Sequence, residues 1–134
     1  MSLINDLLDR PATLSTASSY TAMNGLIYLG AGALLLAWPG ATQALFRDPA
    51  FVGHEAGLIR VVGLMAAVVG WFYLIGGRSG ARQFVAASVF DRLAVPLVLV
   101  PLAIAGVFPH LLLTFAILDP SLAIGAWVLL ARKT

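Results

Sequence analysis

Four apolar runs, each long enough to cross a bilayer as a helix, occupy most of this chain. They cover residues 20–38, 56–77, 84–107 and 111–130. A helix needs about 20 mostly apolar residues to span the hydrocarbon core of a membrane. The chain has 134 residues, of which 60% are hydrophobic and 10% charged, so little is left for a soluble domain. The sequence therefore predicts one integral membrane domain over residues 1–134, an all-α, four-helix transmembrane bundle.

A short amphipathic helix is predicted ahead of the first run, at residues 2–10. Its leucines and Ile4 fall on one helical face, whereas Asp6 and Asp9 fall on the other. Pro11 ends the pattern, because proline cannot continue a helix. We expect this helix to lie at the inner membrane surface, either as a packing arm or as a docking site for a partner.

The positive charges predict the orientation of the four spans. With four spans, both termini and the loop between the second and third runs share one side of the membrane. That side carries Arg10, Arg78, Arg82, Arg132 and Lys133, and the opposite loops carry Arg47. Because Lys and Arg are enriched in cytoplasmic loops, we expect a multi-pass protein of the bacterial inner (cytoplasmic) membrane with both termini in the cytoplasm.

Composition also excludes several classes of function. The net charge of +2 is too small for nucleic-acid binding, so no nucleic-acid partner is expected. The chain contains no cysteine, which excludes disulfides and thiolate metal ligands. His54-Glu55 lacks the second histidine of a zinc-protease helix, and no nucleotide-binding fingerprint is present. No metal site is predicted, and the cofactor is left unknown.

Small residues and prolines predict how the spans pack. Gly63, Gly70 and Gly77 recur every seven residues in the second run, and Gly25 and Gly32 continue the pattern in the first. Small residues allow close backbone approach in lipid, so the first two spans should form the tightest pair. Prolines in the third and fourth runs should kink those spans and leave gaps. Aromatic residues near the run ends are assigned to the membrane interfaces; they are Tyr20, Trp38, Trp71, Tyr73 and Trp127.

Four ionisable residues within the apolar runs form the predicted ligand-binding site: Arg60, Asp91, Arg92 and Asp119. At a rise of 1.5 Å per residue, Arg60 and Asp119 lie about 6 and 12 Å from the outer ends of their spans, and Arg92 about 12 Å from the inner end of its span. Charges within a bilayer are expensive unless they face inward and pair. Asp119 is therefore expected to pair with Arg60, Arg92 or both.

Two alternatives remain open at this point. Asp119 could be neutral and hydrogen-bonded to Thr114, Ser121 or a carbonyl freed by Pro120, or could face a water-filled cavity. Asp91 could instead cap a shorter third span that begins at Leu93, which would leave only Arg60 and Asp119 buried.

The stretch Arg60 to Arg78, "RVVGLMAAVVGWFYLIGGR", followed by Asp91-Arg92 and Asp119, resembles the small four-span inner-membrane proteins of the DoxX-like type found in bacteria. The resemblance covers about residues 56–127 and rests on an Arg-x-x-Gly start and on glycine spacing. It implies the four-helix fold and no particular reaction.

These features lead to one functional hypothesis and two alternatives. The chain is expected to be an accessory subunit, or a binder of a lipid-like or quinone-like amphiphile through its Arg/Asp cluster, in contact with the bilayer and within a homo-oligomer or larger membrane complex. The first alternative is an intramembrane enzyme, an isomerase or hydratase acting on a hydrophobic substrate, with Asp119 as its candidate catalytic acid. The second is an oligomeric transporter or channel.

Overall fold

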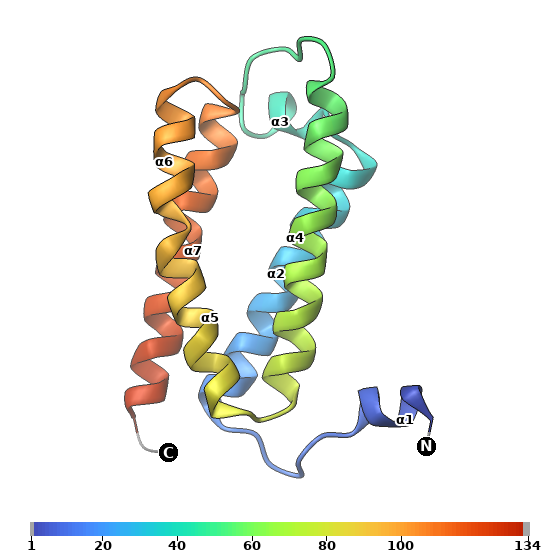
Figure 1. Cartoon of the computed structure of the whole chain (residues 1–134), viewed down its shortest axis with the longest axis vertical. Helices are drawn as coiled ribbons and strands as arrows, with labels where there is room; N and C mark the ends of the chain where they lie inside the picture. Colours follow the sequence, from blue (N-terminus) through green and yellow to red (C-terminus); the bar gives the residue numbers. More distant parts are fainter. Residues whose placement is uncertain (1, 133–134) are drawn as a thin grey trace.

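The structure is a computed structural model that describes residues 2–132, and it is built from helices (Figure 1). Four helical segments are long and apolar enough to cross a membrane. They are α2 (Thr16–Ala37), α4 (Glu55–Arg78), the consecutive pair α5 (Arg82–Ala94) and α6 (Pro96–Ile104), and α7 (Pro109–Ala131). Two short helices, α1 (Leu3–Leu8) and α3 (Ala41–Ala44), complete the described chain. The predicted all-α bundle of four membrane-length helices is confirmed.

Local signals explain where the helices begin and end. Helix α2 begins at Thr16, earlier than the predicted residue 20, because the Ser15 side chain accepts a hydrogen bond from the Ser18 N–H at 3.1 Å and caps the helix. The third span ends at Ile104, earlier than the predicted residue 107. Its chain turns at Gly106, whose φ of +87° favours glycine.

The bundle consists of two helical hairpins that stand side by side (Figure 1). Helices α2 and α4 form the first hairpin, and α5–α6 pack against α7 in the second. We call the end where α2 begins and α7 ends the terminal end, and the opposite end the α3 end. Two buried apolar clusters lie in the bundle: one includes Val85 and Ala126, and the other includes Leu35 and Leu111.

The α2–α4 pair is packed backbone against backbone. A Cβ added at Gly63 would lie 2.6 Å from the backbone nitrogen of Leu36, and one added at Gly70 would lie 2.6 Å from the Gly25 carbonyl oxygen. Neither position has room for a larger residue. This confirms the prediction that the first two spans form the tightest pair, held by van der Waals contact between helix backbones.

The outer surface of the bundle is apolar. Phe90, Leu97 and Ile104 are 77%, 77% and 81% exposed. Large apolar side chains at this density are unusual on a protein surrounded by water, and they suit contact with acyl chains. The separate helix α1 is exposed along its whole length and lies beside the terminal end in Figure 1.

The segment between α2 and α4 contacts the start of α7 and so links the first hairpin to the second at the α3 end. Its Asp48 side chain is buried and accepts hydrogen bonds from the backbone N–H groups of His110, at 2.8 Å, and Leu111, at 3.1 Å. These are early N–H groups of α7, which no residue within that helix can satisfy. Pro109, at the first position of α7, has no N–H to offer. One carboxylate thus caps a helix more than 60 residues away in sequence.

Candidate functional site

The centre of the bundle holds a buried guanidinium. Arg92 of α5 is 1% exposed and is fixed by residues of two helices. Its Nε donates to the Ser88 carbonyl oxygen at 2.8 Å, and Nη2 donates to the Ser88 hydroxyl at 3.0 Å. With the Asn24 amide oxygen turned toward Arg92, Nη1 donates to it at 3.0 Å. Hydrogen bonds to a buried charged group are among the stronger ones in proteins, so this cation is firmly held.

Two tyrosine–carboxyl pairs surround Arg92. The Tyr28 hydroxyl donates to the carboxyl of Asp119, and the Tyr73 hydroxyl donates to both carboxyl oxygens of Asp91, at 2.7 and 2.8 Å. The Arg92 guanidinium lies over the Tyr73 ring, 5.0 Å from its centre, in a cation–π contact. The two tyrosine rings meet edge to face at 5.4 Å. We call these five side chains the polar cluster.

The structure brings three of the four predicted site residues together. Arg92, Asp91 and Asp119 all belong to the polar cluster. Asp91 lies in the last turn of α5, a helix that begins at Arg82, so the alternative in which Asp91 caps a span beginning at Leu93 is wrong. The Asp91 side chain is nevertheless exposed, whereas those of Arg92 and Asp119 are buried.

The structure places Arg60 outside the cluster. Its side chain is exposed and donates to the Leu36 carbonyl oxygen near the end of α2. A long arginine side chain near a helix end reaches the nearest accessible acceptor, and the last carbonyls of α2 supply one. The expected pairing of Arg60 with Asp119 is therefore not found.

Asp119 contacts a tyrosine where an arginine was expected. Within residues 2–132, no arginine lies within ion-pair distance of its carboxyl, and its hydrogen-bond partner is Tyr28. The hydroxyls of Thr114 and Ser121 are not its partners either, because they bond to the carbonyls of His110 and Ile117 one turn earlier in α7. The predicted burial of Asp119 is confirmed, and the predicted arginine partner is wrong.

Four members of the site were missed from sequence: Asn24, Tyr28, Tyr73 and Ser88. Tyr73 was assigned to the membrane interface, and this was wrong, because its ring is buried in the bundle. A signal did exist for Tyr28 and Asn24, since both lie well inside an apolar run, where a buried hydroxyl or amide needs a partner.

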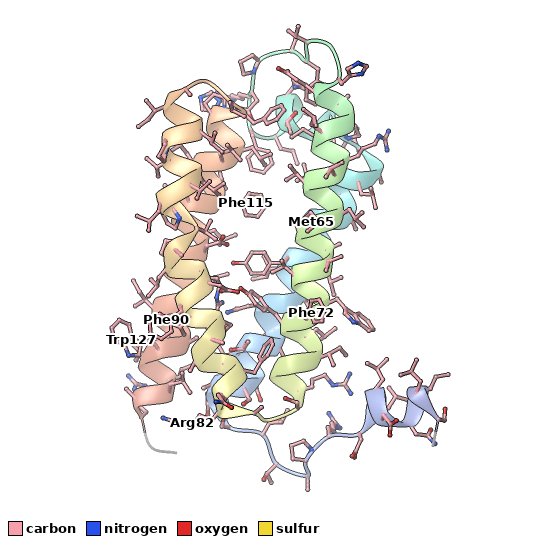
Figure 2. All side chains as sticks on the ribbon, in the orientation of Figure 1. Met65, Phe72, Arg82, Phe90, Phe115 and Trp127 are labelled. Carbon is pink, nitrogen blue, oxygen red and sulfur yellow. The ribbon has the colours of Figure 1, made fainter. Side chains whose placement is uncertain are left out.

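A cavity of about 480 Å³ extends from the polar cluster toward the α3 end. Its volume lies within the usual range for small-molecule sites, roughly 300–1,000 Å³. Figure 2 shows Met65 of α4 and Phe115 of α7 on opposite sides of this space. Apolar side chains form its walls; they are Val61, Val62, Met65, Ala66, Val69, Val95, Leu99, Leu102, Val107, Phe108, Leu112 and Phe115.

The cavity is exposed along one flank and has an aromatic contact at each end. Val61, Met65 and Leu102 line it, yet they are 56%, 56% and 41% exposed on the surface of the bundle. At the α3 end, Phe108 packs edge to face against Phe51, 6.3 Å between ring centres. At the other end Tyr73 packs against Phe84 at the same distance. The opening thus lies between α4 and α6, on the face that would meet lipid.

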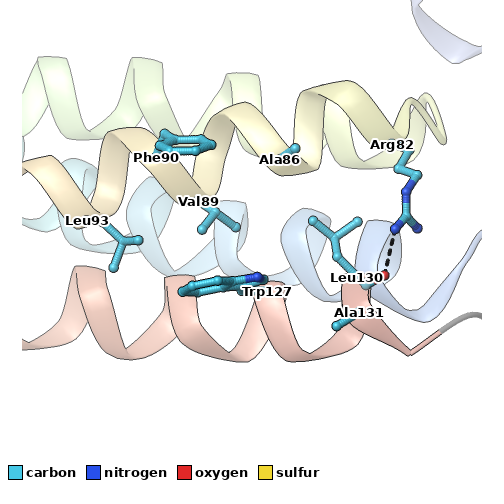
Figure 3. Close-up of a pocket in the computed structure, with 8 residues that line it drawn as sticks. All are labelled: Arg82, Ala86, Val89, Phe90, Leu93, Trp127, Leu130 and Ala131. Atoms are coloured by element: carbon cyan, nitrogen blue, oxygen red, sulfur yellow. Dashed lines mark hydrogen bonds between the residues drawn. The ribbon is translucent and has the colours of Figure 1, made fainter.

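A second, smaller groove of about 340 Å³ lies between α5 and α7 near the terminal end (Figure 3). Val89, Leu93 and Trp127 contribute to its apolar lining. Arg82 lies at its end and donates to the Leu130 carbonyl oxygen at 2.7 Å. The polar cluster does not reach this groove, whose polar side-chain groups are the Arg82 guanidinium and the Trp127 indole N–H.

Within residues 2–132, no three His, Cys, Asp or Glu side chains are close enough together to hold a metal ion. Asp48 and His110 are close to each other, but the Asp48 carboxylate already caps α7. Comparison of the chain with protein-family models, with curated proteins and with solved structures finds no match.

Proposed function

We propose that this protein binds a single-chain amphiphile within the membrane, in the cavity between its two hairpins. One observation carries the proposal: a single cavity has apolar walls along its length and a polar cluster at one end. An amphiphile has the same division, so its tail would contact the apolar walls while its head would meet Tyr28, Tyr73, Asp91, Arg92 and Asp119. Sites for small molecules commonly combine an apolar lining with a few fixed polar groups.

Rigidity of the polar cluster supports a binding role. Each tyrosine hydroxyl is oriented by a carboxyl group, and Arg92 is oriented by Ser88 and Asn24. Groups that are already fixed lose little freedom when a ligand arrives, which favours affinity. A merely structural staple would not require an adjoining cavity.

The test is to identify what the purified protein carries. The full chain would be extracted in a mild detergent, and its organic extract examined by mass spectrometry. We expect wild type, and a Leu64→Phe control on the exposed face of α4, to retain one amphiphile per chain. Ala66→Phe, which fills the cavity, should lose it. Ligand-free wild-type protein that is fully helical would contradict the proposal.

The location and orientation in the membrane are part of the proposal. The protein would lie in the bacterial inner membrane with its terminal end in the cytoplasm, supported by the arginines at that end. The chain contains no cysteine, so single cysteines can be labelled cleanly. An impermeant thiol reagent should modify Ala50→Cys in intact cells and Gln83→Cys only after permeabilisation. The reverse pattern would invert the orientation.

An accessory role in a larger complex remains a proposal as well. It is supported by α1, whose apolar residues Leu3, Ile4 and Leu8 are 84%, 64% and 58% exposed. Deletion of residues 2–8 should then release the protein from a larger species on native gels. Unchanged migration of the truncated chain, at the size of the bundle alone, would remove this role.

An intramembrane enzyme would use the same cavity, and one contact favours it as the second candidate. The Tyr28 hydroxyl and the Asp119 carboxyl are hydrogen-bonded and both line the cavity, as a proton-transfer pair would require. Asp119→Asn should then abolish turnover of the copurified amphiphile while leaving its binding in place. If the extracted amphiphile is chemically unchanged after prolonged incubation with wild type, binding alone is left.

A further inference from the structure

We infer that the ligand is an uncharged single-chain amphiphile with a hydroxyl head, and that it enters sideways from the bilayer between α4 and α6. The inference rests on the proposed function and specifies its ligand class and its route. It draws on three observations: the depth of the polar cluster, the hydrogen-bonding capacity of that cluster, and the exposed flank of the cavity.

The polar cluster lies near the middle of the spans. Arg92 is 10 residues from the start of its span at Arg82 and 12 residues from the end at Ile104. Asp119 is 10 residues from the start of α7 and 12 from its end. At 1.5 Å per residue, both lie roughly 15 Å or more from either end of the bundle. A head group bound there has left the membrane interface and lies at the depth of the acyl chains.

The route to this depth disfavours a charged head. Aromatic contacts lie at both ends of the cavity, whereas Val61, Met65 and Leu102 of its lining are exposed on the flank between α4 and α6, so a ligand coming from the bilayer would reach the cluster through that flank. Met65 and Leu102 border that flank, and both are apolar. A phosphate or ammonium group would cross hydrocarbon without water, which is costly for any ion. A small uncharged polar head crosses at a far lower cost.

The charges of the cluster disfavour an anionic head. Asp91 and Asp119 both line the cavity, so an anionic head would meet two carboxyl groups. Arg92 offsets them only in part, because its guanidinium is already engaged by Ser88, Asn24 and the Tyr73 ring. Phosphate and carboxylate heads are therefore poorly matched to this end of the cavity.

The remaining hydrogen-bonding capacity suits a hydroxyl. Asp119 uses Oδ1 for Tyr28, and no described residue donates to its Oδ2, which can accept from a ligand. The Tyr73 hydroxyl donates to Asp91, and its oxygen retains a lone pair that can accept a hydrogen bond from a ligand. Both open positions are acceptors, so a hydroxyl, which can donate, satisfies this end as a ketone or ester cannot.

The cavity dimensions suit one chain. Its α4 wall runs from Val61 to Tyr73, about 18 Å at the helical rise. This is roughly half the thickness of a hydrocarbon core. With a volume of about 480 Å³, the cavity is of the size that holds one ordinary small ligand. A longer tail would extend through the open flank into the bilayer.

The head group is tested with three photoactivatable probes that share one alkyl chain and carry a hydroxyl, a phosphate or a quaternary ammonium head. Each is added to the full chain in phosphatidylcholine nanodiscs, and labelling is measured by intact-protein mass spectrometry. Labelling of the cavity-filled Ala66→Phe variant is subtracted as background. We expect the alcohol to label at least about tenfold more tightly than either charged probe.

The outcomes separate the inference from the proposed function. If a charged probe labels the cavity as tightly as the alcohol or more so, the hydroxyl-head inference is overturned while amphiphile binding stands. If no probe labels wild type above Ala66→Phe, and no copurified amphiphile is found, the proposed function itself fails.

The lateral route is tested by narrowing the flank. Met65→Trp combined with Leu102→Trp should slow labelling by the alcohol severalfold at early times. The control pair, Leu58→Trp with Val98→Trp, adds two tryptophans at exposed positions of α4 and α6 that do not line the cavity. Equal labelling rates in the two pairs would overturn the lateral route, and circular dichroism confirms that both pairs are helical.

Discussion

The hydroxyl of Tyr28 donates a hydrogen bond to the carboxyl of Asp119, which joins the middle of α2 to the middle of α7 across 91 residues of sequence. It is one of the few polar contacts between the two hairpins. Removing the donor leaves the Asp119 carboxyl, 6% exposed, without its partner.

We therefore expect Tyr28→Phe to lower the free energy of unfolding by about 1–3 kcal/mol, because a buried acceptor loses its donor. Tyr20→Phe is the matched control, since the Tyr20 hydroxyl forms no hydrogen bond with any described residue. A double-mutant cycle with Asp119→Asn, measured by unfolding in detergent, should show coupling of about 0.5–3 kcal/mol. Additive effects would mean that the contact contributes nothing.

Asn24 is expected to matter because it holds the buried guanidinium. Asn24→Leu removes the acceptor of the Arg92 Nη1 group while keeping a side chain branched at the same carbon. Hydrogen bonds to charged groups contribute about 1.5–3 kcal/mol, and we expect a loss of stability of that order. Met23→Leu, at the neighbouring exposed position, should leave the melting temperature unchanged. Similar melting temperatures for the two variants would show that Asn24 does not support Arg92.

Asp48 provides a test of the connection at the α3 end. Asp48→Ala should lower the free energy of unfolding by about 0.5–2 kcal/mol, as for other lost helix caps. Glu55→Ala is the control, because its carboxylate accepts from the Val52 N–H in an exposed position and joins no second hairpin. Hydrogen exchange would locate the effect, which should appear at the first turn of α7. Protection of that turn equal to wild type would contradict the capping role.

The α2–α4 contact predicts opposite effects for two glycines of one helix. Gly63→Ala places a Cβ against the backbone of α2, so we expect a loss of about 1–3 kcal/mol. An added Cβ at Gly57 meets nothing within 4 Å, so Gly57→Ala should be neutral or stabilising by up to about 1 kcal/mol. Thermal unfolding of both variants in one detergent provides the comparison. Equal effects of the two substitutions on stability would show that close approach of the helix backbones does not govern these positions.

The fold could be predicted from sequence because the membrane restricts the choices. Apolar runs of spanning length can only be helices or barrel strands, and their length decides between them. The glycine spacing identified the α2–α4 pair because close approach requires small residues at fixed intervals. The DoxX-like resemblance added nothing to these two inferences and stays a prediction.

The site was predicted only in part, for a physical reason. Depth along a span can be counted from sequence, and it placed Arg92 and Asp119 within reach of one another. The direction in which a side chain points also depends on helix rotation and kinks, which counting ignores. Arg60 illustrates this, since its depth was compatible with Asp119 but its side chain bonds to the carbonyl of Leu36. Tyr73 was missed because tyrosine near a span end is usually interfacial.

The direct backbone contact of α2 with α4 also determines which wall of the cavity can change its shape. The glycines of this contact have no side-chain rotamers to rearrange, so the two helices are held at a fixed spacing there. The opposite wall of the cavity includes α6, which follows the proline joint at Val95–Pro96 and carries Pro101 within it. Proline removes a backbone hydrogen bond and loosens a helix locally. Ligands of different width would consequently be accommodated by bending of α6, while the α2–α4 hairpin keeps its shape.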